Sequence, residues 1–179
     1  MARTHVALLR AVNVGGRNRV PMAELRELCA EELGYTGVRT HLQSGNAVFD
    51  SDREPARIAE ELERALADRF QVSTRVLLRG AGELEELLTA HPYAAEEPDE
   101  AKLMVAFLER APEEDRVRAL TVPPGEEARC TVRGREVFVH YPHGAGRSRL
   151  DNALLERRLG VASTARNLRT VRALREMAG

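Results

Sequence analysis

The sequence predicts an α+β protein built from two small halves, and three observations lead to this prediction. Short apolar stretches alternate with longer stretches whose apolar residues recur every three or four positions, as expected for strands and amphipathic helices. Over residues 1–80 their order is β-α-β-β-α-β, which is typical of the ferredoxin-like sandwich. After an acidic, proline-containing stretch, the order β-α-β-β begins again.

The first half, residues 1–80, should form one antiparallel sheet. Ser44-Gly45 has the composition of a two-residue hairpin turn, so the strands on either side of it should pair directly. A ferredoxin-like half places its four strands in the order 4-1-3-2. The expected strands cover about residues 4–12, 38–43, 46–50 and 74–78.

Two amphipathic helices are expected in this half. The first, over about residues 22–33, should end at Gly34, because glycine readily takes the left-handed backbone that closes a helix. The second follows a Ser51/Asp52 cap. Cys29 falls on the apolar stripe of the first helix, which predicts a core thiol rather than a nucleophile.

Residues 81–100 should form a helix followed by an acidic linker. The helix, over about residues 83–90, should end before His91-Pro92, because the residue before a proline disfavours helical backbone. The acidic linker then covers residues 93–100. This segment is the expected boundary between the two halves.

The second half, residues 101–179, is expected to be a β-α-β-β variant with a helical C-terminal tail in place of a fourth strand. Arg133-Gly134 should form the turn of its hairpin. The tail should consist of two helices, over about residues 149–159 and 164–177. The preceding strands and short helix are expected at about residues 102–108, 112–120, 128–132 and 136–141.

The composition is that of an ordinary globular chain. Hydrophobic residues make up 43% and charged residues 31% of its 179 residues. No apolar run approaches the roughly 20 residues that span a bilayer, and the first residues lack the apolar stretch of a secretion signal. Cys29 and Cys130 do not form the pattern of a disulfide scaffold. The expected compartment is the cytoplasm.

The net charge of −1 is unevenly distributed. Residues 1–23 carry four arginines and no acid, and residues 129–179 carry eleven arginines against four acids, so the segment between them is strongly acidic. This asymmetry indicates either a basic binding face or two halves that attract each other. Lys102 is the only lysine among 27 basic residues. Because arginine is this frequent, any single arginine is weaker evidence for a functional site.

A loop rich in glycine and arginine follows the first expected strand. Glycine lets a ligand approach the backbone, and the free N–H groups at a helix N-terminus carry partial positive charge. In a ferredoxin-like half, this loop and the Ser44-Gly45 turn emerge at the same end of the sheet. We therefore predict a site for a small anionic or phosphorylated ligand made of Arg10, Asn13, Gly15, Gly16, Arg17, Gln43, Ser44 and Asn46. The alternative is that the amide side chains only satisfy the backbone of the two loops.

A second candidate loop repeats the same short pattern. Gly146, Arg147 and Ser148 precede an apolar-periodic helix, as the first glycine-arginine loop does. Ser148 stands three residues before Asp151, which is similar to the start of a capping box. The two loops follow different strands of their halves, so they are not a repeat in register. Coincidence in an arginine-rich chain is the alternative.

No pattern indicates a metal, a cofactor or a catalytic nucleophile, and whether the chain is an enzyme stays open. His140 and His143 flank a Tyr-Pro pair, but no HExxH, CxxC or GxSxG motif occurs. His140 is expected to be a packing residue of a strand. Aromatic residues are only 4% of the chain, too few for a stacking platform, so nucleic acid is expected at most as a weak phosphate-backbone partner. A non-catalytic interaction protein that forms a homodimer is a further alternative, and no membrane partner is expected.

Distinctive short motifs lie at both ends of the chain. They include Ala7-Leu8-Leu9-Arg10, Asn13-Val14-Gly15-Gly16, Val20-Pro21-Met22, Gln43-Ser44-Gly45-Asn46, Tyr141-Pro142, Gly146-Arg147-Ser148, Leu159-Gly160, Thr164-Ala165-Arg166-Asn167 and Thr170-Val171.

With these motifs the chain resembles, over nearly its whole length, a family of bacterial proteins catalogued as domain of unknown function 1697. His91-Pro92-Tyr93 is also similar to the Asn-Pro-aromatic motif of that family. Ala11 stands where the family usually has glycine, and Leu168 stands where it usually has tryptophan. The resemblance implies an α+β fold and brings no established activity or catalytic residue.

Overall fold

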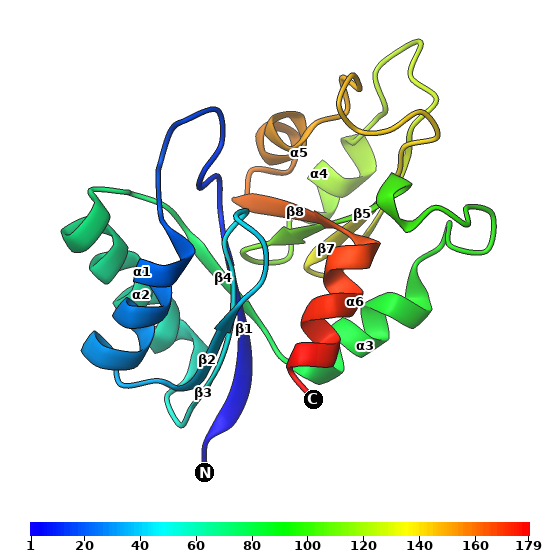
Figure 1. The fold of residues 1–179 in the computed structure, drawn as a ribbon. Helices are drawn as coiled ribbons and strands as arrows, with labels where there is room; N and C mark the ends of the chain where they lie inside the picture. Colours follow the sequence, from blue (N-terminus) through cyan, green and yellow to red (C-terminus); the bar gives the residue numbers. More distant parts are fainter. The chain divides into compact units, whose positions relative to one another are not determined.

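The computed structural model describes residues 1–179, which form two compact units (Figure 1). The first unit comprises Met1–Glu85 and Ala173–Gly179, and the second comprises Glu86–Arg172. Each unit contains one four-stranded sheet, and all neighbouring strands are antiparallel. The predicted α+β class with two sheet-containing halves is confirmed.

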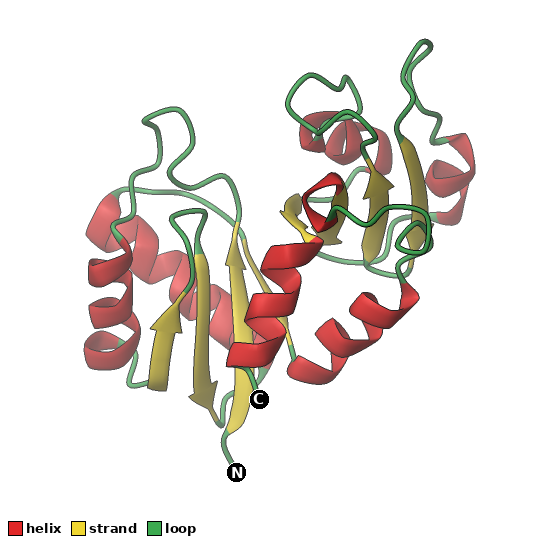
Figure 2. Cartoon of the chain, turned by 45° about the vertical axis from the view of Figure 1, so that its right-hand side comes forward, coloured by secondary structure: helices red, strands yellow, loops and turns green.

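The sheet of the first unit has the strand order β2-β3-β1-β4. Helices α1 and α2 lie on one face of this sheet (Figure 2). The elements of the unit are β1 (Arg3–Leu9), α1 (Met22–Glu27), a π-helical turn (Leu28–Glu32), β2 (Thr36–Thr40), β3 (Asn46–Ser51), α2 (Pro55–Phe70) and β4 (Val76–Arg79).

The core of the first unit lies between its sheet and its helices. Leu9 and Phe49 project from the strands into this core, and the Phe49 ring stacks on the Tyr35 ring with 4.4 Å between centroids. Val6 and Leu8 alternate with the core residues along β1, yet they are also fully buried. Because both faces of β1 are buried, its sequence is a continuous apolar run rather than an alternating one.

Two local predictions in the first unit are wrong. The connection between β2 and β3 covers residues 41–45 and is not a two-residue turn. The N-cap of α2 is Glu54, three residues beyond the predicted cap at Ser51, whose hydroxyl instead accepts a hydrogen bond from the Arg53 amide. The first helix covers the predicted residues and ends before Gly34, which has a φ of +72°, and it widens into a π-helical turn from Leu28 onward.

The sheet of the second unit has the strand order β6-β7-β5-β8. Helices α4 and α5 pack on one face of it over a core that includes Leu108, Val139, Leu154 and Leu155. The remaining elements of the chain are α3 (Ala81–Ala90), a 3₁₀ turn (Glu100–Lys102), β5 (Leu103–Leu108), α4 (Glu114–Ala119), β6 (Arg129–Arg133), β7 (Glu136–His140), α5 (Asn152–Leu159), β8 (Ser163–Asn167) and α6 (Leu168–Met177).

The two predicted tail helices are present as α5 and α6, but the prediction that they replace a fourth strand is wrong, because Ser163–Asn167 forms that strand. Alanine and arginine favour a helix here, but pairing with β5, from Leu108 opposite Ser163 to Met104 opposite Asn167, overrides that propensity. Asn167 then caps α6, since its side-chain oxygen accepts a hydrogen bond from the Thr170 amide at 2.9 Å. The second unit therefore has the same β-α-β-β-α-β order as the first.

No helix combines the length and the apolar character that crossing a lipid bilayer requires.

The interior of the first unit contains Cys29, as predicted, with no exposed surface. Burial raises the pKa of this thiol to about 12, so it stays protonated at neutral pH.

The tightest backbone approach in the first unit is at Gly45. A Cβ atom at this position would lie 2.5 Å from Cγ2 of Val12 and 2.8 Å from Cβ of Leu9, and φ is +88°. We expect Gly45→Ala to lower the free energy of unfolding by about 2 kcal/mol or more, since overpacking costs about 1–3 kcal/mol and left-handed backbone adds about 1 kcal/mol. Urea unfolding measures this loss.

Gly15→Ala is the matched control for this prediction. Gly15 also has a positive φ, +57°, but no atom lies within 4 Å of the position that a Cβ atom would take there. Its substitution should cost only about 1 kcal/mol. Equal losses in the two variants would show that the close approach at Gly45 has no energetic weight.

Candidate functional site

The glycine-arginine loop after β1 contains a small hairpin. Val14 and Arg17 form a bridge, and the Arg17 amide donates a hydrogen bond to the Val14 carbonyl at 3.0 Å. Gly15 and Gly16 are the central residues of this turn, with φ of +57° and +75°. Two consecutive positive φ angles define a type I′ turn, which explains both glycines without a ligand.

Asn13 anchors this hairpin to its surroundings. Its side-chain oxygen accepts a hydrogen bond from the Val20 amide at 2.8 Å. Its side-chain nitrogen donates to the Val20 carbonyl at 2.9 Å and to the Gln43 carbonyl at 2.6 Å. The last bond joins the loop after β1 to the β2–β3 connection, and both leave the same end of the first sheet (Figure 1). The predicted meeting of the two loops is therefore present.

Other predicted ligand groups are also used by the loops themselves. Asn46 is fully buried, and its side-chain nitrogen donates to the His41 carbonyl at 2.8 Å and to the Ser44 hydroxyl at 2.9 Å. Asn18 donates to the Ala11 carbonyl at 3.0 Å. The side chains of Asn13 and Asn46 thus satisfy loop backbone, which is the alternative that the sequence left open.

We call residues 13–19 together with residues 41–45 the tip of the first unit. Arg17 and Arg19 are exposed at the tip, and their guanidinium groups take part in none of the hydrogen bonds and ion pairs of the unit. Val14 and Leu42 are also exposed, at 62% and 57%. The tip therefore presents unpaired cations beside aliphatic side chains.

The backbone of this region is unusually rich in left-handed residues. Leu42 has a φ of +60°, which a bulky side chain rarely adopts. Ala11 has a φ of +53°, and this gives a physical reason for the glycine that the resembling family usually has there. The other residues of the loops with positive φ are Asn13, Gly15, Gly16, Asn18 and Gly45.

Arg10 does not join the rest of the predicted site. Its amide donates to the Arg75 carbonyl at 3.0 Å, and its carbonyl accepts a hydrogen bond from the Thr74 hydroxyl. Its side chain lines a different hollow of about 580 Å³ beside α2, together with Glu63 and Arg64. The predicted set of residues is therefore divided between this hollow and the tip.

The second candidate loop lines a separate pocket of about 410 Å³ in the second unit, where Arg147 and Ser148 lie beside Glu126 and Glu127. The Ser148 hydroxyl donates to Glu126 at 2.9 Å. Hydrogen bonds from the Arg149 amide and from Ser148 lower the pKa of Glu126, so this carboxylate is a weak base.

The spacing of Ser148 and Asp151 predicted a capping-box-like start of α5 at Ser148, but Ser148 is not the cap of this helix. The N-cap of this helix is Asp151, whose side chain accepts a hydrogen bond from the Leu154 amide at 2.8 Å. The Ser148 hydroxyl also accepts a hydrogen bond from the Leu150 amide, so one of its hydrogen bonds lies within the loop and the other joins the loop to Glu126.

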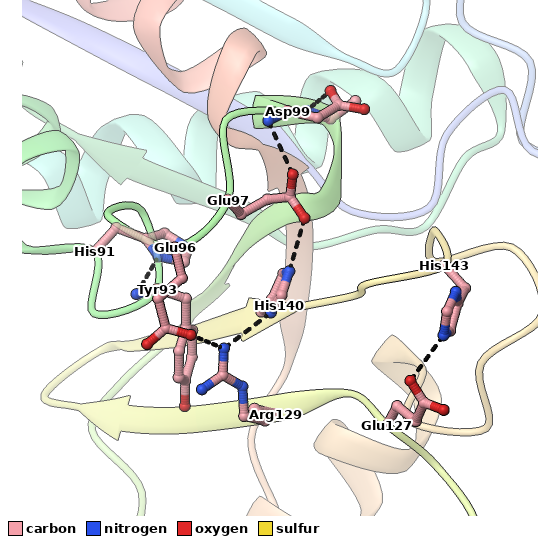
Figure 3. A network of polar contacts seen from close by, with 10 residues as sticks. His91, Tyr93, Glu96, Glu97, Asp99, Glu127, Arg129, His140 and His143 are labelled. Atoms are coloured by element: carbon pink, nitrogen blue, oxygen red, sulfur yellow. Dashed lines mark hydrogen bonds and ion pairs between the residues drawn. The ribbon is translucent and has the colours of Figure 1, made fainter.

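Sequence reasoning missed a polar cluster on the second sheet (Figure 3). Nε2 of His140 lies 3.0 Å from Glu97, and its Nδ1 lies 3.2 Å from the Arg129 guanidinium. Arg129 also pairs with Glu96 and lies over the Tyr93 ring, with 4.6 Å from its Cζ to the ring centroid. The His91-Pro92-Tyr93 motif is the sequence signal that could have found it.

The hydrogen bonds of this cluster attach segment 91–99 to the second sheet. A guanidinium can only donate, so its contact with Nδ1 assigns the ring proton of His140 to Nε2, which donates to Glu97. Both ring nitrogens are therefore hydrogen-bonded within the unit. The Tyr93 hydroxyl bonds to Thr131 at 2.6 Å, so segment 91–99 is fixed along β6 and β7.

The structure brings together no group of three or more histidine, cysteine, aspartate or glutamate side chains that could hold a metal ion. Near the pocket of the second loop, His143 pairs only with Glu127, at 2.8 Å. Cys29 and Cys130 are both unbridged, and burial raises the pKa of each thiol. Neither is therefore an activated nucleophile at neutral pH.

Comparison with known proteins identifies the relatives of the chain. Residues 2–138 match the profile of a family described as "Protein of unknown function (DUF1697)". The chain is also similar to the conserved bacterial protein SP0830 from Streptococcus pneumoniae, with a TM-score of 0.76 and 25% sequence identity over 100% of both chains. No curated protein matches it.

A pH-dependent stability follows from His91, which is buried within the second unit. Burial lowers its pKa below the usual 6.5. Between 6.5 and this lowered pKa the unfolded chain binds more protons than the folded one, so the free energy of unfolding should fall as the pH drops below 6.5. Glu96 and Glu97 have lowered pKa values, so their contribution disappears only below about pH 4.5.

Urea unfolding at pH 7.5, 6.5 and 5.5 measures this effect. The variant His91→Gln should lose the stability change between pH 6.5 and 5.5. His143→Gln, which removes an exposed histidine, is the control and should keep the wild-type profile. A His91→Gln profile identical to that of the wild type would contradict the assignment.

Proposed function

The chain belongs to the DUF1697 family, and because the description of that family assigns no activity, we propose from the geometry of the tip that the protein binds a small anionic or phosphorylated ligand. One observation carries this proposal: Arg17 and Arg19 are exposed at the tip with no carboxylate or carbonyl partner. Guanidinium groups bind phosphate and carboxylate through paired, charge-assisted hydrogen bonds. The partners of these two arginines would then come from outside the chain.

The rigidity of the loop supports the same proposal. The Asn13 side chain, at the start of the hairpin, bonds to Val20 after its end and to Gln43 of the neighbouring connection, and a type I′ turn closes the hairpin. A ligand that binds Arg17 and Arg19 would therefore order side chains but little backbone, and this lowers the entropic cost of binding. The Gln43 side chain, which makes no hydrogen bond, adds a neutral polar group at the same tip.

The second glycine-arginine loop is a weaker candidate for the same ligand. Arg147 is also exposed and unpaired, but the pocket that it lines contains the carboxylates of Glu126 and Glu127. Two carboxylates repel an anion at close range. For this reason we place the proposed site at the tip.

A protein-interaction role, including a homodimer, is the second candidate function, and two side chains favour it. Besides Met1, Val14 and Leu42 are the only large hydrophobic residues exposed in the chain. Both belong to the tip, and exposed apolar surface can mark a protein interface. Arg17 and Arg19 beside them would favour an acidic partner surface.

Fold and compartment complete the proposal. We propose that both units are ferredoxin-like, on the basis of their shared β-α-β-β-α-β order and antiparallel pairing. A cytoplasmic location is in line with two unbridged cysteines. The division into residues 1–80, 81–100 and 101–179 stays a proposal of the same kind.

The ligand proposal predicts a thermal shift that depends on the tip. In a screen of nucleotides, pyrophosphate and phosphorylated metabolites, at least one compound should raise the melting temperature. At about 100 times Kd the gain is about 2.7 kcal/mol, which corresponds to roughly 5–10 °C in a chain of this length. The double variant Arg17→Ala/Arg19→Ala should lose this shift and keep the melting temperature of the free protein, because neither side chain has a partner.

Arg147→Ala is the matched control, an exposed and unpaired arginine in the other glycine-arginine loop. It should leave the shift unchanged. A shift that survives in the tip variant but disappears in Arg147→Ala would overturn the proposed location. Binding only of duplex DNA, with an affinity that collapses between about 50 and 200 mM salt, would replace the small ligand by a phosphate-backbone contact.

A further inference from the structure

A hollow of about 470 Å³ lies between α4 and α5 in the second unit, far along the chain from the tip. Its lining consists of Asp115, Arg116, Ala119, Arg157 and Arg158. Three of these side chains are cationic and one is anionic. The carboxylate of Asp115 is also shared with Arg118, whose guanidinium lies 3.5 Å away. The charged lining is therefore dominated by guanidinium groups.

Arg116 is fixed over the end of α5. Its guanidinium donates to the Arg158 carbonyl at 3.3 Å. A Cβ atom at Gly160 would lie only 3.1–3.2 Å from the guanidinium atoms of Arg116. The guanidinium of Arg116 therefore rests on the backbone of Gly160. A side chain at position 160 would push this guanidinium away.

Not all the arginines around the hollow take part in hydrogen bonds at the end of α5. Arg116 donates to the carbonyl of Arg158 in the last turn of α5, and Arg110 donates to the carbonyl of Gly160, its C-cap. Arg157 and Arg158 are exposed, and their guanidinium groups make no hydrogen bond or ion pair. Elsewhere on the same two helices, Arg118 is paired with Glu114 at 3.0 Å. Two arginines of the hollow are thus left without a partner.

We infer that this hollow is a second anion site, which takes a phosphate-class dianion through Arg116, Arg157 and Arg158. Several guanidinium groups that converge on one hollow match the oxygens of a phosphate, and each can form two parallel hydrogen bonds to it. Arg157 and Arg158 have no partner within the chain, and Arg116 uses only one of its five N–H groups on the Arg158 carbonyl, so all three can donate to a ligand. The site is independent of the proposed function of the tip and lies in the other unit.

The test uses the full chain with Arg17→Ala and Arg19→Ala in the background, so that binding at the tip does not contribute. Inorganic phosphate and pyrophosphate are titrated by calorimetry at 50 mM salt. Pyrophosphate should bind, and the added pair Arg157→Ala/Arg158→Ala should weaken the affinity at least tenfold. The melting temperature of the free protein should not change, because neither guanidinium has a partner to lose.

The matched control is the added pair Arg39→Ala/Arg64→Ala. It removes the same amount of charge from exposed positions that do not line the hollow, and it should leave the affinity within about twofold. Absence of phosphate and pyrophosphate binding in the background protein would overturn the inference. An equal loss of affinity in the two pairs would also overturn it, since net charge alone would then explain the binding.

Discussion

No side chain fits at position 45, and the rest of the tip depends on this constraint. Because Gly45 is bare, its carbonyl can accept a hydrogen bond from the Leu9 amide at 2.9 Å, and the β2–β3 connection can lie against the end of β1. That contact brings Gln43 within reach of the Asn13 side chain, which in turn holds the hairpin with Arg17. The close backbone approach at Gly45 therefore allows the Asn13 side chain to anchor the hairpin, and the anchored hairpin presents the charge of Arg17.

The sequence is a good guide to backbone periodicity and a poor guide to the partners of polar side chains. The order of the apolar runs, with a hairpin expected between the second and third, predicted that two loops meet at one end of the first sheet, although the hairpin connection is longer than the expected Ser44-Gly45 turn. The fate of Asn13 and Asn46 could not be predicted, because an amide serves backbone and ligand equally well until the fold supplies its partners. The strand at Ser163–Asn167 was missed because its pairing with β5 is a tertiary effect that outweighs local helix propensity.

The two units share an element order but differ in where their loops are long. In the first unit the long connection is residues 10–21, after the first strand, and the corresponding connection of the second unit is residues 109–113. In the second unit the long connection is residues 141–151, after β7. The Gly-Arg pattern occurs in both long connections, although these connections follow strands at different positions in their units. A common fold therefore does not imply a common site in the two units.

Arginine is so frequent in this chain that its presence alone carries little information, whereas its bonding does. Arg69 joins α2 to the end of α1 through Glu27 and to the π-helical turn through Glu32, and Arg129 is held by Glu96 and Tyr93. Such side chains are already used within the fold, and a ligand would have to displace their partners. Arg17 and Arg158 have no such partner to displace. The proposed anion sites therefore rest on which guanidinium groups the folded chain leaves unsatisfied.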